Sequence, residues 1–219
     1  MEKLYDEFAG FLQPTSATIF QDVIERVNPQ SILEVGFFKG GSAFFWLSFS
    51  NARLLCVDSM RWEGCSIENI KKLIDLFPER FAFIGESSTK VYSKLRNVYF
   101  DLFFIDGGHT SDLVINDIQL GIDLNIPYLF LDDVSPNIFQ LFQRLTKNKY
   151  EVIKIYDRKA DQEWIHMILA RRIRVSWAHL VGNEEMLLEE RIDKWQRVLN
   201  EKPVEIPSIW RKLKRKVCW

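Results

Sequence analysis

Two short acidic stretches carry the most distinctive chemistry in the sequence. Asp106 and His109 follow one short apolar run, and Asp132 and Asp133 follow another. If these runs are neighbouring parallel strands, their ends open into one crevice and bring the three carboxylates together. Like charges in a cleft are unfavourable unless a cation binds or a pKa rises, and oxygen ligands of this kind suit Mg²⁺. A histidine beside them has a pKa suited to a general base near neutral pH.

A glycine-containing stretch lies upstream, where residues 34–42 read E-V-G-F-F-K-G-G-S. Gly36 and Gly40 at a strand-to-helix turn let a ligand approach the backbone, and the helix start offers free N–H donors. The dinucleotide fingerprint GxGxxG is absent, because Phe38 occupies its second glycine position. Taken alone, the stretch also fits a tight turn in another Rossmann-like protein.

Further polar residues follow the next two apolar runs. Asp58, 18 positions after Gly40, is placed to accept ribose hydroxyls or to cap the segment that follows it. Glu86 and Ser87 follow the third apolar run, where two serines are also an ordinary helix N-cap. Trp62 would either cover the ligand or pack on the surface.

The elements that must position these residues alternate regularly. Apolar runs typical of buried parallel strands lie at 32–35, 54–57, 81–84, 102–105 and 128–131. Helical spacing fills the gaps at 41–49, 66–77, 88–96, 111–122 and 135–146. Five such units in series predict an α/β protein with an open, doubly wound sheet that binds ligands beyond the carboxyl ends of its strands.

The pattern changes at both ends of the chain. Two strand-like runs at 150–156 and 164–170 have no helix between them, which predicts an edge hairpin with one antiparallel strand. Helices are expected at 2–12 and 15–28, and another at about 183–200. We therefore predict one domain over 1–172 and a helical C-terminal extension over 173–219 that packs on it.

The order of the motifs resembles that of a known family. E-x-G-x-x-x-G followed by I-D-G-x-H and L-D-D-V looks like methyltransferase family 24, a class I S-adenosylmethionine-dependent group, over roughly residues 30–135. It is similar to metal-dependent catechol-type and sugar O-methyltransferases. The resemblance implies a Rossmann-like, mostly parallel seven-stranded sheet. The cofactor-binding residues that it implies are Glu34, Gly36, Phe37, Gly40, Ser42, Asp58, Glu86, Ser87 and Asp106. Among these, the resemblance places Glu86 and Ser87 against the adenine.

The resemblance also implies a reaction. Asp106, Asp132 and Asp133 would hold Mg²⁺ or another divalent cation that clamps a hydroxyl, with His109 and Asp106 as catalytic residues. The catechol-type pattern has Asp-Asn where this chain has Asp132-Asp133, which leaves the ligand set open. The expected enzyme methylates a hydroxyl of a small molecule, sugar or glycan. The alternative is a non-catalytic binding protein with the same fold.

Composition limits the expected cellular location and the expected binding partners. The net charge of −1 gives no reason to expect nucleic acid. The three cysteines form no zinc-ligand or disulfide pattern, and no signal peptide or apolar span of about 18 residues is evident, so a cytoplasmic protein is expected. The basic, tryptophan-containing tail at 209–219 is either a peripheral membrane contact or a solvated end. The oligomeric state is left open, with a homodimer as one option.

Overall fold

The computed structural model describes residue 8 and residues 16–157 and 166–173. Seven strands form one sheet: β1 (Ser31–Val35), β2 (Arg53–Val57), β3 (Phe81–Ile84), β4 (Leu102–Ile105), β5 (Tyr128–Leu131), β6 (Tyr150–Asp157) and β7 (His166–Arg172). The helices with described bounds are α2 (Ala17–Val27), α3 (Gly41–Phe49), α4 (Ile67–Leu76), α5 (Ser88–Leu95), α6 (Ser111–Asp123) and α7 (Pro136–Thr146).

The strand order is β3-β2-β1-β4-β5-β7-β6. The first five strands in this order are parallel, whereas β7 runs antiparallel to both of its neighbours. The order reverses between β1 and β4, so the topological switch point lies where Val35 pairs with Ile105. In doubly wound sheets, ligands bind at this point, beyond the carboxyl ends of the strands.

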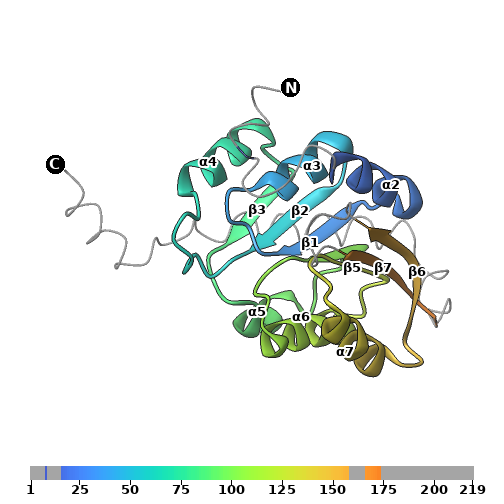
Figure 1. Ribbon diagram of the computed structural model, residues 1–219. Helices are drawn as coiled ribbons and strands as arrows, with labels where there is room; N and C mark the ends of the chain where they lie inside the picture. The colour runs from blue at the N-terminus through green and yellow to red at the C-terminus, as the bar shows by residue number, and fades with distance from the viewer. Residues whose placement is uncertain (1–7, 9–15, 158–165, 174–219) are drawn as a thin grey trace.

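Helices cover both faces of the sheet (Figure 1). α2, α3 and α4 lie on one face, and α5, α6 and α7 lie on the other. Each face has its own apolar core, and the core under α3 is rich in aromatic rings: Phe20 contacts Phe45, Trp46, Phe104 and Phe130. α3 is buried almost all round, because α2 covers its outer side. The loop that precedes α3 therefore ends at a helix that is packed on nearly all sides.

The predicted fold is confirmed, including the hairpin at one edge of the sheet, in which β7 is the antiparallel strand and lies between β5 and the edge strand β6. Element bounds agree with the predicted ones within about two residues, since glycines and polar residues interrupt the apolar runs where the chain turns. The expected helices at 2–12 and 183–200 and the extension beyond Ile173 fall largely or wholly outside the described residues, so the proposed domain division stays a prediction. None of the described helices combines the length and apolar character that crossing a membrane requires.

Candidate functional site

The loop between β1 and α3 lies at the switch point and touches the end of β4. Gly36 has a φ of +97°, and a Cβ atom there would lie 2.0 Å from the carbonyl oxygen of Asp106. Gly40 has a φ of +85°, and a Cβ atom there would lie 2.6 Å from the ring of Phe37. Both positions therefore need glycine for backbone conformation and for space.

Asp58 binds this loop to the end of β2. Its Oδ2 accepts hydrogen bonds from the amides of Phe37 at 2.7 Å and Phe38 at 3.4 Å. Its Oδ1 accepts from the amide of Met60 at 2.6 Å. The carboxylate thus also caps its own following segment, the alternative raised from the sequence. A carboxylate has about four lone-pair sites, so a ribose contact stays a prediction that these bonds permit.

Three contacts that sequence reasoning missed support the same loop from α4 and the segment before it. The side-chain amide of Asn69 donates to the carbonyl of Lys39 at 2.8 Å, and the amide of Ser66 donates to the carbonyl of Phe38 at 2.9 Å. The rings of Phe38 and Trp62 lie 6.3 Å apart. Phe38 has a φ of +48°, an uncommon conformation for a bulky residue, and these contacts hold it there.

Glu34 lies beneath the loop and is fully buried. It accepts hydrogen bonds from the hydroxyl of Ser42 and from the thiol of Cys56, whose sulfur lies 2.9 Å from Oε2. Burial raises the pKa of Glu34 to about 7, while the two hydrogen bonds act in the opposite direction. Burial also raises the pKa of the Cys56 thiol, so the thiol stays neutral and able to donate. The structure places Glu34 under the candidate ligand crevice, and the ring of Phe37 is buried in the core as well.

The start of α3 offers backbone donors. Its N-cap is Gly40, so no side chain accepts from the first amides of this helix. By contrast, the hydroxyl of Ser66 caps α4 and that of Ser135 caps α7. An anionic group of a ligand at the start of α3 would meet free N–H groups and the positive end of the helix dipole.

The loop after β3 has its polar side chains engaged locally. Glu86 forms an ion pair with Lys94 at 2.9 Å, and the hydroxyls of Ser87 and Thr89 lie 2.9 Å apart. Ser87 is the N-cap residue of α5, but its side chain makes no capping bond. The adenine contacts expected of Glu86 and Ser87 remain predictions.

The ends of β4 and β5 bring His109 and Asp133 together. Nδ1 of His109 lies 3.3 Å from Oδ2 of Asp133, and both side chains are partly exposed, at 50% and 39%. Oδ1 of Asp132 accepts a hydrogen bond from the amide of Asp133 at 2.8 Å. Asp133 has a φ of +51°, which turns the chain at this point. Since Ser135 caps α7, neither aspartate serves as its cap.

The three carboxylates expected to bind a metal do not converge among the described residues. Asp106 and Asp132 follow paired residues of neighbouring strands, as predicted. Within residues 16–157 and 166–173, however, no three His, Cys, Asp or Glu side chains converge as a metal site would require. One reason is that Oδ1 of Asp132 binds a backbone amide and Asp133 pairs with His109. The binding of a divalent cation by Asp106, Asp132 and Asp133 therefore has no support from the described residues and stays a prediction.

A buried polar cluster that sequence reasoning missed lies below the loop after β4. Asp117 on α6 is almost fully buried, and a Cβ atom on Gly107 would lie 3.3 Å from its Oδ2. Burial raises the pKa of Asp117 to about 6, while hydrogen bonds from Ser88 and Asn116 act to lower it. The cluster links α6, the start of α5 and the His109 loop. Its only sequence signal is an acidic residue on the apolar face of an amphipathic helix.

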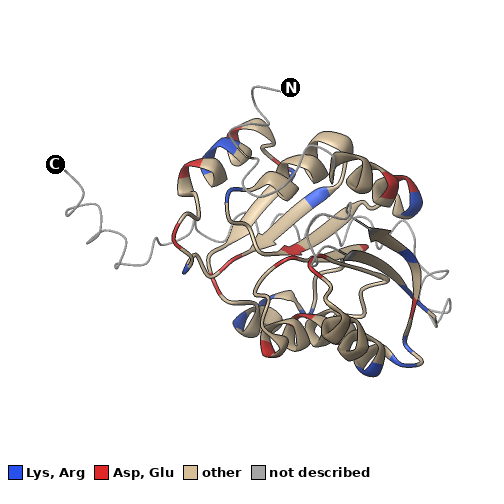
Figure 2. Ribbon diagram, in the orientation of Figure 1, with Lys and Arg blue, Asp and Glu red and all other residues tan. Residues whose placement is uncertain are grey.

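Acidic residues dominate the carboxyl ends of the parallel strands (Figure 2), where the red segments lie on the loops between strands and helices. The acidic residues in the loops that directly follow β2 to β5 are Asp58, Glu63, Glu86, Asp106, Asp132 and Asp133. This balance of charge favours a cationic ligand over a polyphosphate.

Comparison with known proteins agrees with this geometry. A family model described as a methyltransferase domain matches residues 33–127. It is the model of methyltransferase family 24, so the predicted family is confirmed for this region. No curated protein sequence matches the chain.

Solved structures share the fold. The chain is similar to the O-methyltransferase from Bacillus cereus solved in complex with SAH, with 15% identity, 78% of this chain and 86% of that chain covered, and a TM-score of 0.59. The O-methyltransferase TomG from Streptomyces achromogenes, solved with SAM, has 14% identity, coverages of 74% and 81%, and a TM-score of 0.59. A putative RNA methyltransferase from Pyrococcus horikoshii has 10% identity, coverages of 79% and 94%, and the same TM-score. These likenesses show the fold and leave the methyl acceptor open.

Proposed function

Because residues 33–127 form a class I methyltransferase domain of the S-adenosylmethionine-dependent type, we propose that this chain methylates a hydroxyl group of a small molecule or sugar. The observation that carries the proposal is the His109–Asp133 pair at 3.3 Å, at the carboxyl ends of β4, which pairs with β1 before the glycine loop, and of β5 beyond it. A base held by a carboxylate beside a cofactor loop is what removal of a hydroxyl proton requires.

The glycine loop and α3 supply the cofactor side of the crevice. The amides at the start of α3 suit the carboxylate of the methionine part, and Gly36 and Gly40 keep side chains away from it. The acidic loop ends suit a ligand that carries a positive sulfonium charge. When bound, S-adenosylmethionine supplies an electrophilic methyl group.

His109 acts on the acceptor. Asp133 favours the proton on Nδ1 of His109, which leaves Nε2 as the atom that accepts the hydroxyl proton. The imidazolium formed in this step is stabilised by the carboxylate of Asp133 and passes its proton to water, because the pair is partly exposed. General-base assistance of this kind contributes about 10²- to 10⁴-fold to a rate.

The proposed acceptor class rests on the negative charge of the loops that follow the parallel strands. Phosphate-rich substrates meet the acidic loop ends unfavourably, so an uncharged sugar or a phenol is the better acceptor. No step of the proposed reaction is assigned to a divalent cation. Metal dependence remains a prediction of the motif resemblance, and chelator treatment of the active enzyme tests it separately.

The proposal is tested by measuring S-adenosylhomocysteine release from the full chain with panels of sugars, glycosides and phenols. Release that depends on one acceptor class and falls in His109→Ala supports it. A folded protein that binds S-adenosylmethionine but methylates no hydroxyl acceptor in either panel contradicts it.

A further inference from the structure

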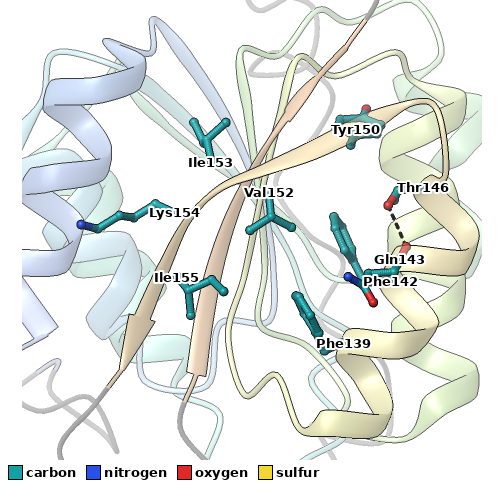
Figure 3. A pocket seen from close by; sticks show the side chains of 9 residues that line it. All are labelled: Phe139, Phe142, Gln143, Thr146, Tyr150, Val152, Ile153, Lys154 and Ile155. Atoms are coloured by element: carbon teal, nitrogen blue, oxygen red, sulfur yellow. Dashed lines mark hydrogen bonds between the residues drawn. The ribbon is translucent and has the colours of Figure 1, made fainter.

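A groove lined by both apolar and polar residues lies between α7 and β6, on the face of the sheet that carries α5, α6 and α7 (Figure 3). Its volume is about 670 Å³. Phe139, Phe142, Gln143 and Thr146 line it from α7, and Tyr150, Val152, Ile153, Lys154 and Ile155 line it from β6. It begins near the amino end of α7, at the edge where the candidate site lies, and ends at the opposite edge of the sheet.

The outer wall of this groove is poorly covered. Ile155 is 52% exposed and Ile153 is 37% exposed, although β6 pairs with β7 on its inner side. A bulge between Val152 and Lys154 leaves Ile153 without a register partner in β7, whereas Ile155 pairs with Ile168. Ile173, just after β7, is 50% exposed. An edge strand with exposed isoleucines is a surface that proteins usually cover.

The chain itself leaves β7 at the foot of the groove. The amide of Ile173 donates to the carbonyl of Lys149 at 2.8 Å, directly before the start of β6. The ten residues from 174 to 183 span at most about 35 Å when extended, which is enough to reach either end of β6. A helix over 183–200 would be about 27 Å long, and the eight-residue strand β6 is also about 27 Å long.

The segment 183–200 has the pattern that this surface needs. Its apolar residues Leu188, Ile192, Trp195 and Leu199 follow helical spacing along one face. Its first half carries four acidic residues, Glu184, Glu185, Glu189 and Glu190. Lys147 and Lys149 lie in the turn between α7 and β6, at the foot of the groove, where this acidic half would enter, whereas the side chain of Lys154 points away from the groove. Length, exit point and charge all favour this one occupant.

We propose that residues 183–200 dock as an amphipathic helix in the groove between α7 and β6, with their apolar face on Ile153 and Ile155. The helix completes the layer that α5, α6 and α7 leave open at the sheet edge. This arrangement is independent of which acceptor the enzyme methylates.

Amide hydrogen exchange on the full chain tests the docking. In the unchanged protein, the amides of 187–199 are expected to be protected relative to those after Pro203. Ile155→Asp and, separately, Ile153→Asp place a charge on the docking surface and are expected to lower that protection by about tenfold. Ile74→Asp on α4 is the matched control, because Ile74 is also exposed, at 43%, but lies on the opposite face of the sheet.

Two exchange results overturn the proposal. The first is exchange of 187–199 at the rate of an unstructured peptide in the unchanged protein. The second is full protection in both groove variants while each still melts cooperatively. Light scattering at several protein concentrations tests whether a second copy of the chain occupies the groove instead. A dimer that dissociates in Ile155→Asp would assign the groove to that second copy and overturn the proposal. Because these readouts involve no methyl transfer, their failure is distinct from a failure of the proposed function.

Discussion

The two sides of the topological switch point are built differently. On the β1–β2 side, the loop from Gly36 to Gly40 is fixed by Asp58, by the side chain of Asn69 and by direct contact with the backbone of β4. On the β4–β5 side, Nδ1 of His109 lies 3.3 Å from Oδ2 of Asp133, and both side chains are partly exposed. The side proposed to bind the cofactor is therefore fixed by several contacts, whereas the side proposed to bind the acceptor is more open.

This difference suits a transferase whose donor is constant and whose acceptor must enter and leave. A rigid donor site lowers the ordering cost of binding, and an open base can be completed by the acceptor itself. Substitutions on the two sides should therefore differ in their effects on stability, catalysis and cofactor binding.

Matched glycine variants test the difference in rigidity most severely. In Gly36→Ala, the new methyl group meets the carbonyl oxygen of Asp106 at 2.0 Å, and the φ of +97° is strained for alanine, so we expect a loss of more than about 3 kcal/mol of stability. In Gly108→Ala, the methyl group meets the end of the Leu113 side chain, which is partly exposed and can move. We expect a loss of less than about 1 kcal/mol there. Urea unfolding of both variants measures the difference, and equal losses would contradict it.

Removal of the base tests the open half. His109→Ala is expected to lower kcat by about 10²- to 10⁴-fold and to leave the affinity for S-adenosylmethionine unchanged. Asp133→Asn is expected to cause a smaller loss of about tenfold, since the imidazole remains but loses its carboxylate partner. Steady-state kinetics with calorimetry separates the two effects. Weaker S-adenosylmethionine binding in His109→Ala would contradict the separation of cofactor binding from the His109 side of the site.

The pH dependence of stability tests the buried carboxyl under the loop. The usual pKa of Glu34 is 4.5, and burial raises it to about 7 in the folded protein. The folded state therefore holds this proton more tightly than the unfolded state, and stability falls as the pH rises from about 4.5 through 7, by about 3 kcal/mol in total. Glu34→Gln removes this dependence, so it should gain stability relative to the unchanged protein over that range. A constant difference between the two proteins from pH 4.5 to 8 would contradict the assignment.

The smallest effect is expected at Asn69. Asn69→Ala removes the hydrogen bond to the carbonyl of Lys39 and is expected to cost about 1 kcal/mol of stability. Because the loop is then less well fixed, the dissociation constant for S-adenosylmethionine should rise by about three- to tenfold. Asn116→Ala, on the other side of the switch point, serves as the comparison and should leave that constant unchanged.

The sequence predicted the parallel core well, because buried strands such as β4 are continuous apolar runs between turn residues. It also predicted that Asp106 and Asp132 would follow neighbouring strands. It could not show that Asp58 binds the backbone of the glycine loop or that Asp133 pairs with His109. Such partners depend on side-chain direction and on left-handed turns at residues like Phe38 and Asp133, which have no clear sequence signal.

The roles of Asn69 and Asp117 were missed for a related reason. Each lies on a helix and acts on a loop that is distant in sequence, so only the packing of α4 and α6 brings it there. For Glu34, the motif predicted a cofactor contact, which stays a prediction. The structure shows that Glu34 is buried under the loop and accepts hydrogen bonds from Ser42 and Cys56.

Calorimetric titration of S-adenosylmethionine into the unchanged protein and into Asp58→Ala tests the central claim most directly. We predict micromolar binding to the unchanged protein and a loss of at least about tenfold in the variant, since Asp58 fixes the Phe37 and Phe38 amides of the cofactor loop. His109→Ala should bind as the unchanged protein does. Absence of binding to a protein that melts cooperatively would contradict the account.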